Sequence, residues 1–184
     1  MHDILAIAGS PSASSRSSAV LARAKSTLEA QGLHVETFTI RDIKPEDLVF
    51  DNFESLELQK FVSLEAAAKG IMIATPVYKA TYTGILKALL DLLPQYAFSD
   101  KTILPIATGG TVTHLLSIEY SMKPLFAVLG ATHIERGIFI VDAQMQRLEG
   151  GGIQLDDDIE TRLQDSLQLF ARSITTQKSL DYTR

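Results

Sequence analysis

Short apolar runs that alternate with helical patterns are the feature that most limits how this chain can fold. Four of the runs are typical of strands buried on both faces of a sheet, namely residues 3–8, 70–74, 102–107 and 134–141. A fifth run, residues 34–39, alternates apolar and polar residues, which is typical of a strand nearer the sheet edge. Because helical spacing of apolar residues fills the intervals, the sequence predicts an α/β protein with a parallel sheet and helices on both faces.

The size of the chain favours one particular winding of such a sheet. Five strands within 184 residues fit the flavodoxin-like doubly wound arrangement, with strand order 2-1-3-4-5, better than the larger dinucleotide-binding fold. We expect a single domain over residues 1–184, with helices at residues 20–28, 53–68, 84–93 and 155–167. The glycine-rich stretch at residues 149–152 is most simply a surface turn before the last helix.

Composition excludes several classes of function. The net charge is −5 and no block of Lys or Arg forms a basic stripe, so we expect no nucleic-acid partner. The chain has no cysteine, which removes disulfides, thiolate catalysis and Cys-ligated zinc, and its four His do not cluster, so we expect no metal site. No apolar run is long enough to cross a membrane and the N-terminus lacks a signal pattern, so we expect a cytoplasmic protein.

The loop after the first strand carries the sharpest chemical signal. Residues 9–18 read GSPSASSRSS, with six Ser among ten residues. Hydroxyl groups beside the free amides of a helix N-terminus form an anion site, to which Arg16 would add a charge-assisted contact. With one glycine and no GK[ST], the loop suits a phosphomonoester better than a pyrophosphate. The alternative is a Ser-rich helix cap that binds no ligand.

Two further loops follow strands at the same expected edge of the sheet, where ligands bind in open parallel sheets. TPVYKATYTG (residues 75–84) places Tyr78 and Tyr82 beside a strand end, where aromatic rings would border a flat heterocycle. TGGTVTH (residues 108–114) carries two consecutive glycines, which allow the backbone to lie close to something flat. Tyrosines packed on the next helix and a plain tight turn are the alternative interpretations.

One helical pattern loses its phase. From Val112 to Leu129 the apolar positions share one side until Glu119 falls among them, and an additional residue near Tyr120 would restore the phase. Such insertions occur as π-bulges, often at functional sites. A proline kink at Pro124 is the alternative.

Three stretches together carry a specific likeness, namely GSPSASSRSS (9–18), ATPVYKATYTGILKALLDLLP (74–94) and LPIATGGTVTHLLSIEYSMKPLFAVLGA (104–131). They resemble the NADPH-dependent FMN reductase family, and within it the alkanesulfonate-type reductases, over residues 4 to about 141. The resemblance implies an NAD(P)H:FMN oxidoreductase that supplies reduced FMN to a partner monooxygenase of sulfonate assimilation. It also implies a homodimer or homotetramer.

The resemblance also assigns residues. It implies that FMN is held by Ser10, Ser15, Arg16, Ser17 and Ser18 at its phosphate, and by Pro76, Val77, Tyr78, Lys79, Thr108, Gly109 and Gly110 along the isoalloxazine. Many relatives carry Arg at the place of Ser12, and Arg16 is the residue that we expect to compensate. Tyr120 matches a Tyr insertion that forms a π-helix at a tetramer interface and is associated with transfer of reduced flavin.

The expected chemistry requires little of the side chains. Hydride passes between cofactors, so the protein has to stack nicotinamide on flavin, and we predict no catalytic side chain. The sequence does not decide between NADPH and NADH as the hydride donor, because it contains no recognisable binding motif for a 2′-phosphate. Lys79 is the nearest obvious cation for a nucleotide phosphate. Two alternatives remain: an enzyme of the same fold that keeps its FMN and reduces quinones, azo dyes or metal oxyanions, and a non-catalytic flavodoxin-like electron carrier.

Overall fold

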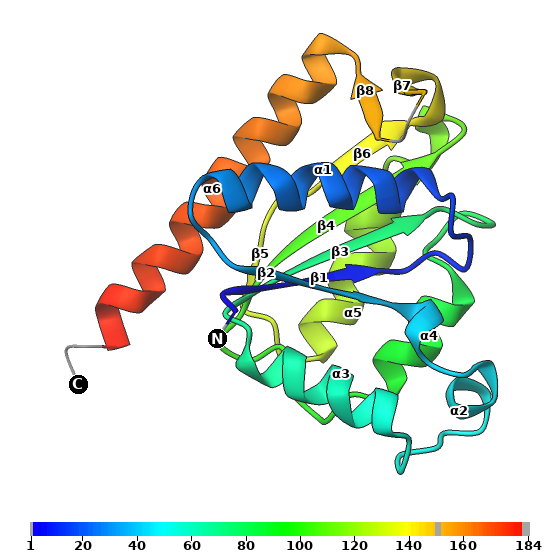
Figure 1. The fold of residues 1–184 in the computed structure, drawn as a ribbon, viewed down its shortest axis with the longest axis vertical. Coiled ribbons are helices and arrows are strands. Elements are labelled where there is room, and N and C mark those ends of the chain that lie inside the picture. Colours follow the sequence, from blue (N-terminus) through cyan, green and yellow to red (C-terminus); the bar gives the residue numbers. More distant parts are fainter. Residues whose placement is uncertain (1, 150–151, 182–184) are drawn as a thin grey trace.

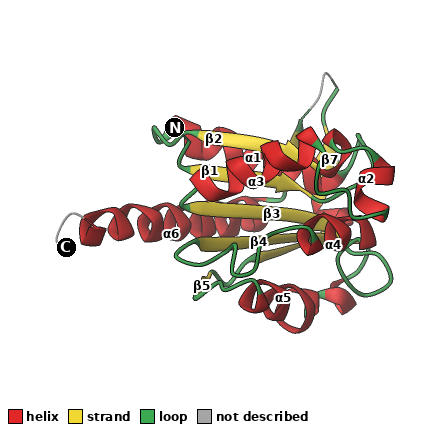
Figure 2. Cartoon of the chain, turned by 90° about the horizontal axis from the view of Figure 1, so that it is seen from below, coloured by secondary structure: helices red, strands yellow, loops and turns green. Residues whose placement is uncertain are grey.

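A parallel sheet between two helical layers forms the body of the molecule (Figure 1). The computed structural model describes residues 2–149 and 152–181. The strands of the sheet are β1 (Ile4–Ala8), β2 (Val35–Thr39), β3 (Gly70–Pro76), β4 (Thr102–Gly109), β5 (His133–Ile134) and β6 (Ile138–Val141). They follow the order β2-β1-β3-β4-β5, with β6 also paired to β4, and every pair is parallel (Figure 2). The expected flavodoxin-like winding is confirmed.

Helices cover both faces of the sheet. On one side lie α1 (Arg16–Ala30) and α6 (Asp157–Asp181), and on the other lie α3 (Leu56–Ala67), α4 (Gly84–Asp91) and α5 (Lys123–Val128), with the short α2 (Pro45–Val49) beside them (Figure 1). Within β1, Leu5 and Ile7 belong to one core cluster, whereas Ile4 and Ala6 belong to the other. Burial on both faces explains why the strand runs are continuously apolar. Among the described helices, none combines the length and apolar composition that a membrane crossing requires.

The outermost strand is interrupted, whereas the sequence predicts one strand over residues 134–141. The Ile103 carbonyl of β4 accepts a hydrogen bond from the Glu135 amide at 2.8 Å. Pro105 lies two residues further along β4 and faces the same neighbouring strand. It has no N–H to donate, so the hydrogen bonding between the two strands is interrupted there. Gly137 lies next to Pro105 and has a φ of +78°. A Cβ on Gly137 would lie 2.6 Å from the Pro105 ring. The single strand therefore becomes β5 and β6.

A small hairpin precedes the last helix where the sequence predicts only a turn. Strands β7 (Met145–Arg147) and β8 (Ile153–Leu155) pair in antiparallel register. Of the predicted turn, Gly150 and Gly151 lie outside the described residues. Met145, Ile153 and Leu155 are buried in the core cluster between α1 and α6, so the hairpin is anchored to the body of the protein. Three-residue strands are too short to show a periodic signal.

The segment with the phase defect is not one helix. A 3₁₀ turn (Val112–His114) is followed by a π-helix (Ile118–Met122) and then by α5. Tyr120 lies at the middle of the π-helix, so the predicted extra residue is confirmed. Pro124 is the second residue of α5. It follows the π-helix directly, so the inserted residue and the missing proline N–H lie in adjoining helical turns.

A buried ion pair joins α3 to the start of β4, at the edge of the sheet opposite the three loops. Glu65 and Lys101 are 3 % and 8 % exposed, and the Lys101 Nζ lies 3.5 Å from the Glu65 Oε1. The same ammonium donates to the Ala68 carbonyl at 2.8 Å. Burial raises the pKa of Glu65, and the opposing effect of Lys101 does not cancel the rise. The Glu65 carboxylate therefore depends on Lys101 for its charged form.

We predict that Lys101→Met lowers the free energy of unfolding by about 3 kcal/mol at pH 7, because it leaves the Glu65 carboxylate buried without its cation. The Glu65→Leu/Lys101→Met double variant should recover most of this loss. Urea denaturation at several pH values checks both. Since a carboxyl with a raised pKa is neutral at low pH, the loss from Lys101→Met should shrink as the pH falls from 7 toward the ordinary Glu value of 4.5. An equal loss at both ends of this range would contradict the prediction.

Candidate functional site

The loops that follow β1, β3 and β4 meet in one cavity at the carboxyl ends of these strands. Its volume is about 270 Å³. It is lined by Ser10, Ser12, Ser14, Ser15, Arg16, Pro76, Val77, Tyr78, Thr108, Gly109, Gly110, Asp142 and Arg147. Open parallel sheets bind ligands at this position, on either side of the point where the winding reverses.

Most of the predicted site residues line this cavity, and four do not. Ser17 is buried and its hydroxyl lies 2.7 Å from that of Ser15. Ser18 lines a second cavity, of about 300 Å³, that shares Ser14, Ser15 and Arg147 with the first. Lys79 lies at the tip of a turn beyond the lining, and Tyr120 borders a separate groove between α4 and α5. Tyr82 lines that groove too and packs partly buried against the core, in agreement with the packing interpretation.

The first turn of α1 is left without the cap that its sequence offers. Ser15 occupies the N-cap position, but within the described residues its hydroxyl makes no capping hydrogen bond. At α4, by contrast, the N-cap Thr83 accepts from the Leu86 amide at 3.2 Å. The first amides of a helix have no intrahelical partner, so those of α1 remain available to an anion. This geometry favours anion binding over a simple Ser-rich cap.

A buried hydroxyl ties the first two loops together. The Thr83 hydroxyl donates to the Gly9 carbonyl at 2.6 Å, and the Gly9 amide donates to the Ala74 carbonyl of β3 at 2.8 Å. A Cβ on Gly9 would lie 2.8 Å from the Leu86 side chain. The start of the Ser-rich loop is therefore fixed against β3 and α4, and only glycine fits at the contact.

The second loop forms a tight turn under strain. Tyr78 and Thr81 pair as an antiparallel bridge, and Lys79 and Ala80 between them have φ values of 50° and 75°. Two consecutive positive values are those of a type I′ turn, which Asn-Gly adopts most readily. Lys and Ala adopt this conformation at a cost of about 1 kcal/mol or more each. The turn sets Tyr78, which is 50 % exposed, at the cavity wall.

The third loop contributes a flat stretch of backbone. The Thr108 carbonyl accepts from the Val77 amide at 2.7 Å, which joins this loop to the second. A Cβ on Gly109 would lie 3.1 Å from the Phe139 ring, whereas one on Gly110 would meet nothing within 4 Å. Gly110 therefore faces open space, and a planar group has room against the backbone there.

Two charged residues of the cavity were not predicted from the sequence. Asp142, just after β6, lies 3.5 Å from the Arg16 guanidinium. Arg147, on β7, donates to the Ser14 carbonyl. Both residues follow the outermost strand, at the same edge of the sheet as the other loops. Asp142 could have been predicted from the sequence, because it comes directly after an expected strand. The position of Arg147 depends on the β7–β8 hairpin, which was not predicted from the sequence.

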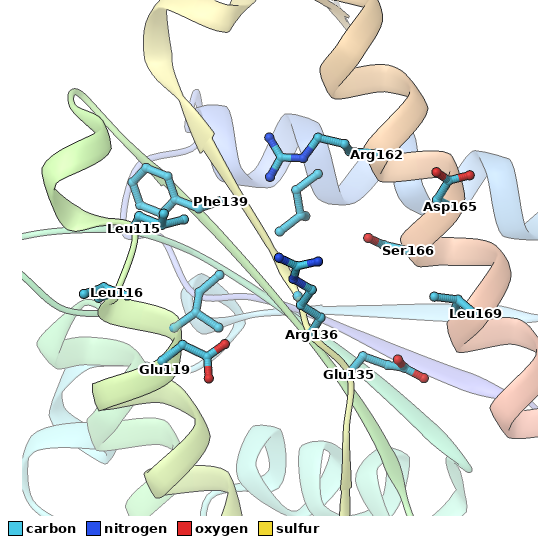
Figure 3. A pocket seen from close by; sticks show the side chains of 13 residues that line it. Leu115, Leu116, Glu119, Glu135, Arg136, Phe139, Arg162, Asp165, Ser166 and Leu169 are labelled. Atoms are coloured by element: carbon cyan, nitrogen blue, oxygen red, sulfur yellow. The ribbon is translucent and has the colours of Figure 1, made fainter.

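A larger cavity lies elsewhere on the molecule and contains none of the predicted flavin-binding residues. Its volume is about 540 Å³, and it lies between the π-helix, the β5–β6 connection and α6. Figure 3 shows Arg136 and Arg162 extending into it above an apolar wall that includes Phe139 and Leu115. We therefore regard the smaller cavity, where the three loops converge, as the candidate functional site.

Comparisons with known proteins relate this chain to flavin reductases. The family described as NADPH-dependent FMN reductase matches residues 2–146 of the chain. An FMN reductase (NADPH) of Pseudomonas putida is 45% identical over 168 residues, which cover 91% of this chain and 85% of that protein. An FMN reductase (NADPH) of Escherichia coli is 40% identical over 171 residues, 93% and 89% of the two chains. The solved apo form of an NADH:FMN oxidoreductase (EMOB) matches with a TM-score of 0.85 and 32% identity, covering 94% and 90%.

We predict that Thr83→Val lowers the free energy of unfolding by about 2 kcal/mol, because it leaves the Gly9 carbonyl and the Leu86 amide buried without their partner. Urea denaturation measures the change. Thr37→Val is the matched control on the exposed face of β2 and should change stability by less than about 0.5 kcal/mol. Equal losses in the two variants would contradict the role of the Thr83 hydroxyl.

Ala80→Gly should stabilise the protein by about 0.5 to 1 kcal/mol, since glycine adopts a positive φ without steric cost. Thermal unfolding followed by circular dichroism detects the change. Ala143→Gly, an exposed alanine whose φ is not positive, is the control and should not stabilise. A gain in both variants, or in neither, would show that the turn at Lys79 and Ala80 carries no strain.

Proposed function

Since the chain belongs to the NADPH-dependent FMN reductase family, we propose that it reduces FMN and releases the product to a monooxygenase. The enzyme is an NAD(P)H:FMN oxidoreductase. The observation that carries the proposed mode of binding is the convergence of the three strand-end loops on one cavity. The residues of this cavity fit the two ends of FMN, which are an anion and a flat heterocycle.

The Ser-rich loop is the proposed phosphate end. Ser10, Ser15 and Arg16 line the cavity directly, and the free amides of Ser17 and Ser18 lie in the first turn of α1. Hydroxyls, amides and the positive end of the helix dipole all favour a phosphate at this position. The role of Ser17 and Ser18 is accordingly carried by the backbone, because their side chains do not line the cavity.

The second and third loops form the proposed ring end. Pro76, Val77 and Tyr78 form one wall, and Thr108, Gly109 and Gly110 form the other. FMN held between these walls would supply the hydride-accepting chemistry, and the chain would have to hold the flavin and nicotinamide rings in contact. Lys79, exposed at the tip of its turn, is the nearest cation of the second loop for a nucleotide phosphate. No side chain needs to exchange a proton in the hydride step itself.

The π-helix supports the proposed transfer of reduced flavin. Tyr120 at its centre is 77 % exposed and borders a groove with Tyr82 and Val128. Tyr96 and Val128, which are 60 % and 76 % exposed, line the same groove, and a group of exposed apolar side chains around an irregular helix suits an interface. We propose that this surface joins homodimers into a tetramer and governs flavin release to an alkanesulfonate-type monooxygenase. The competing function is an enzyme that retains FMN and reduces another acceptor.

The protein as purified should be colourless, and oxidation of NADPH should depend on added FMN. Absorbance at flavin wavelengths, followed by NADPH and NADH titrations with and without FMN, measures both properties. A yellow protein whose nucleotide oxidation does not respond to added FMN would favour the flavin-retaining enzyme.

Tyr120→Ala should retain FMN through purification and lose most of its turnover of added FMN, because the variant removes the side chain that we place at the release surface. The matched control is Phe50→Ala, which also truncates an exposed aromatic residue and should behave like the parent protein. Unchanged release and turnover in Tyr120→Ala would remove the transfer role, although FMN reduction itself would stand.

A further inference from the structure

Arg147 reaches the candidate site from a part of the chain that follows the last strand of the sheet. It ends β7, and its register partner on β8 is Ile153. The hairpin is fixed to the core by Met145, Ile153 and Leu155, which are 8 %, 8 % and 6 % exposed. Although its own side chain is exposed, Arg147 therefore projects from an anchored element.

The guanidinium of Arg147 lies at the Ser-rich loop. One of its nitrogens donates to the Ser14 carbonyl, and this contact orients the side chain toward the Ser-rich loop. Arg147 lines both the candidate site and the second cavity, which also contains Ser18, so it forms part of the wall between them. A guanidinium carries five N–H donors, so the contact with Ser14 leaves others for a second partner.

The balance of charge in the cavity singles out the same residue. Three of the lining residues are charged, namely Arg16, Asp142 and Arg147. Arg16 and Asp142 form an ion pair, and within the described residues Arg147 forms none. The net positive charge of the cavity lining is therefore that of Arg147, and it lies against the backbone of Ser14, whose hydroxyl is 3.4 Å from that of Ser12.

We propose that Arg147 binds the phosphate of the flavin and thereby makes the enzyme prefer FMN to riboflavin. The inference rests on the proposed binding of FMN in this cavity and adds a residue that determines specificity. A guanidinium matches the oxygens of a phosphate, and charge-assisted hydrogen bonds of this kind are about twice as strong as neutral ones. Riboflavin has a hydroxyl in place of the phosphate and gains nothing from the charge.

The test is steady-state reduction of FMN and of riboflavin by Arg147→Ala and Arg147→Lys at fixed NADPH. Arg147→Ala should raise the KM for FMN about tenfold or more, which corresponds to one charge-assisted contact. The KM for riboflavin and the kcat for both flavins should stay within about twofold, because the ring end is untouched. Arg147→Lys should recover part of the affinity for FMN, since it keeps the charge without the planar fork.

Arg162→Ala is the matched control, because it removes an equally exposed arginine from the separate cavity of Figure 3. It should leave both KM values unchanged, which separates a local contact from the change in net charge. Titration of each flavin by quenching of its fluorescence gives the same comparison without turnover. Turnover of riboflavin by Arg147→Ala also shows that the variant is folded.

Two failures are distinguishable. If the parent protein reduces FMN but Arg147→Ala has the same KM for FMN, or loses affinity equally for both flavins, the role of Arg147 is wrong and the proposed function stands. If the parent protein does not reduce FMN at all, the proposed function itself fails.

Discussion

The hydrogen bond from the buried Thr83 hydroxyl to the Gly9 carbonyl is the constraint on which the site depends. The same hydroxyl caps α4, and the Thr83 amide donates to the Thr75 hydroxyl at 3.3 Å. One side chain thus fixes the start of the Ser-rich loop, the exit from β3 and the first turn of α4 relative to one another. Because these contacts are buried, they hold without competition from water. The loops that line the rest of the cavity are therefore held in fixed positions relative to Thr83.

Near Thr83, the site contains two local conformations that the sequence would not favour by itself. The N-cap serine of α1 does not cap its helix, and the turn after β3 uses Lys and Ala where glycine would be relaxed. Unsatisfied or strained positions persist only where the surrounding structure determines them, and they gather at functional sites. Here Ser15 lines the cavity, and the strained turn holds Tyr78 at the wall of the same cavity. An anion on the α1 amides would supply the partner that the Ser15 side chain does not.

The sequence was informative wherever burial imposes a repeating pattern. Continuous apolar runs identified the central strands because both of their faces are covered, and the phase defect near Tyr120 located the π-helix. Prediction from the sequence failed where a single contact between distant residues decides the local structure. The break between β5 and β6 arises from Pro105 meeting Gly137 across the sheet, and the β7–β8 hairpin has strands too short for periodicity. Arg147 was missed for that reason, and so was the ion pair of Arg16 with Asp142.

The interruption of the outermost strand also bears on how the protein behaves at high concentration. An edge strand with a long, regular row of unpaired N–H and C=O groups invites another chain to extend the sheet. Here β5 spans His133–Ile134 and β6 spans Ile138–Val141, with a left-handed glycine between them. A foreign strand would therefore find no continuous ladder to join. The proline that costs this sheet one hydrogen bond therefore also makes the β5–β6 edge a poor template for edge-to-edge pairing.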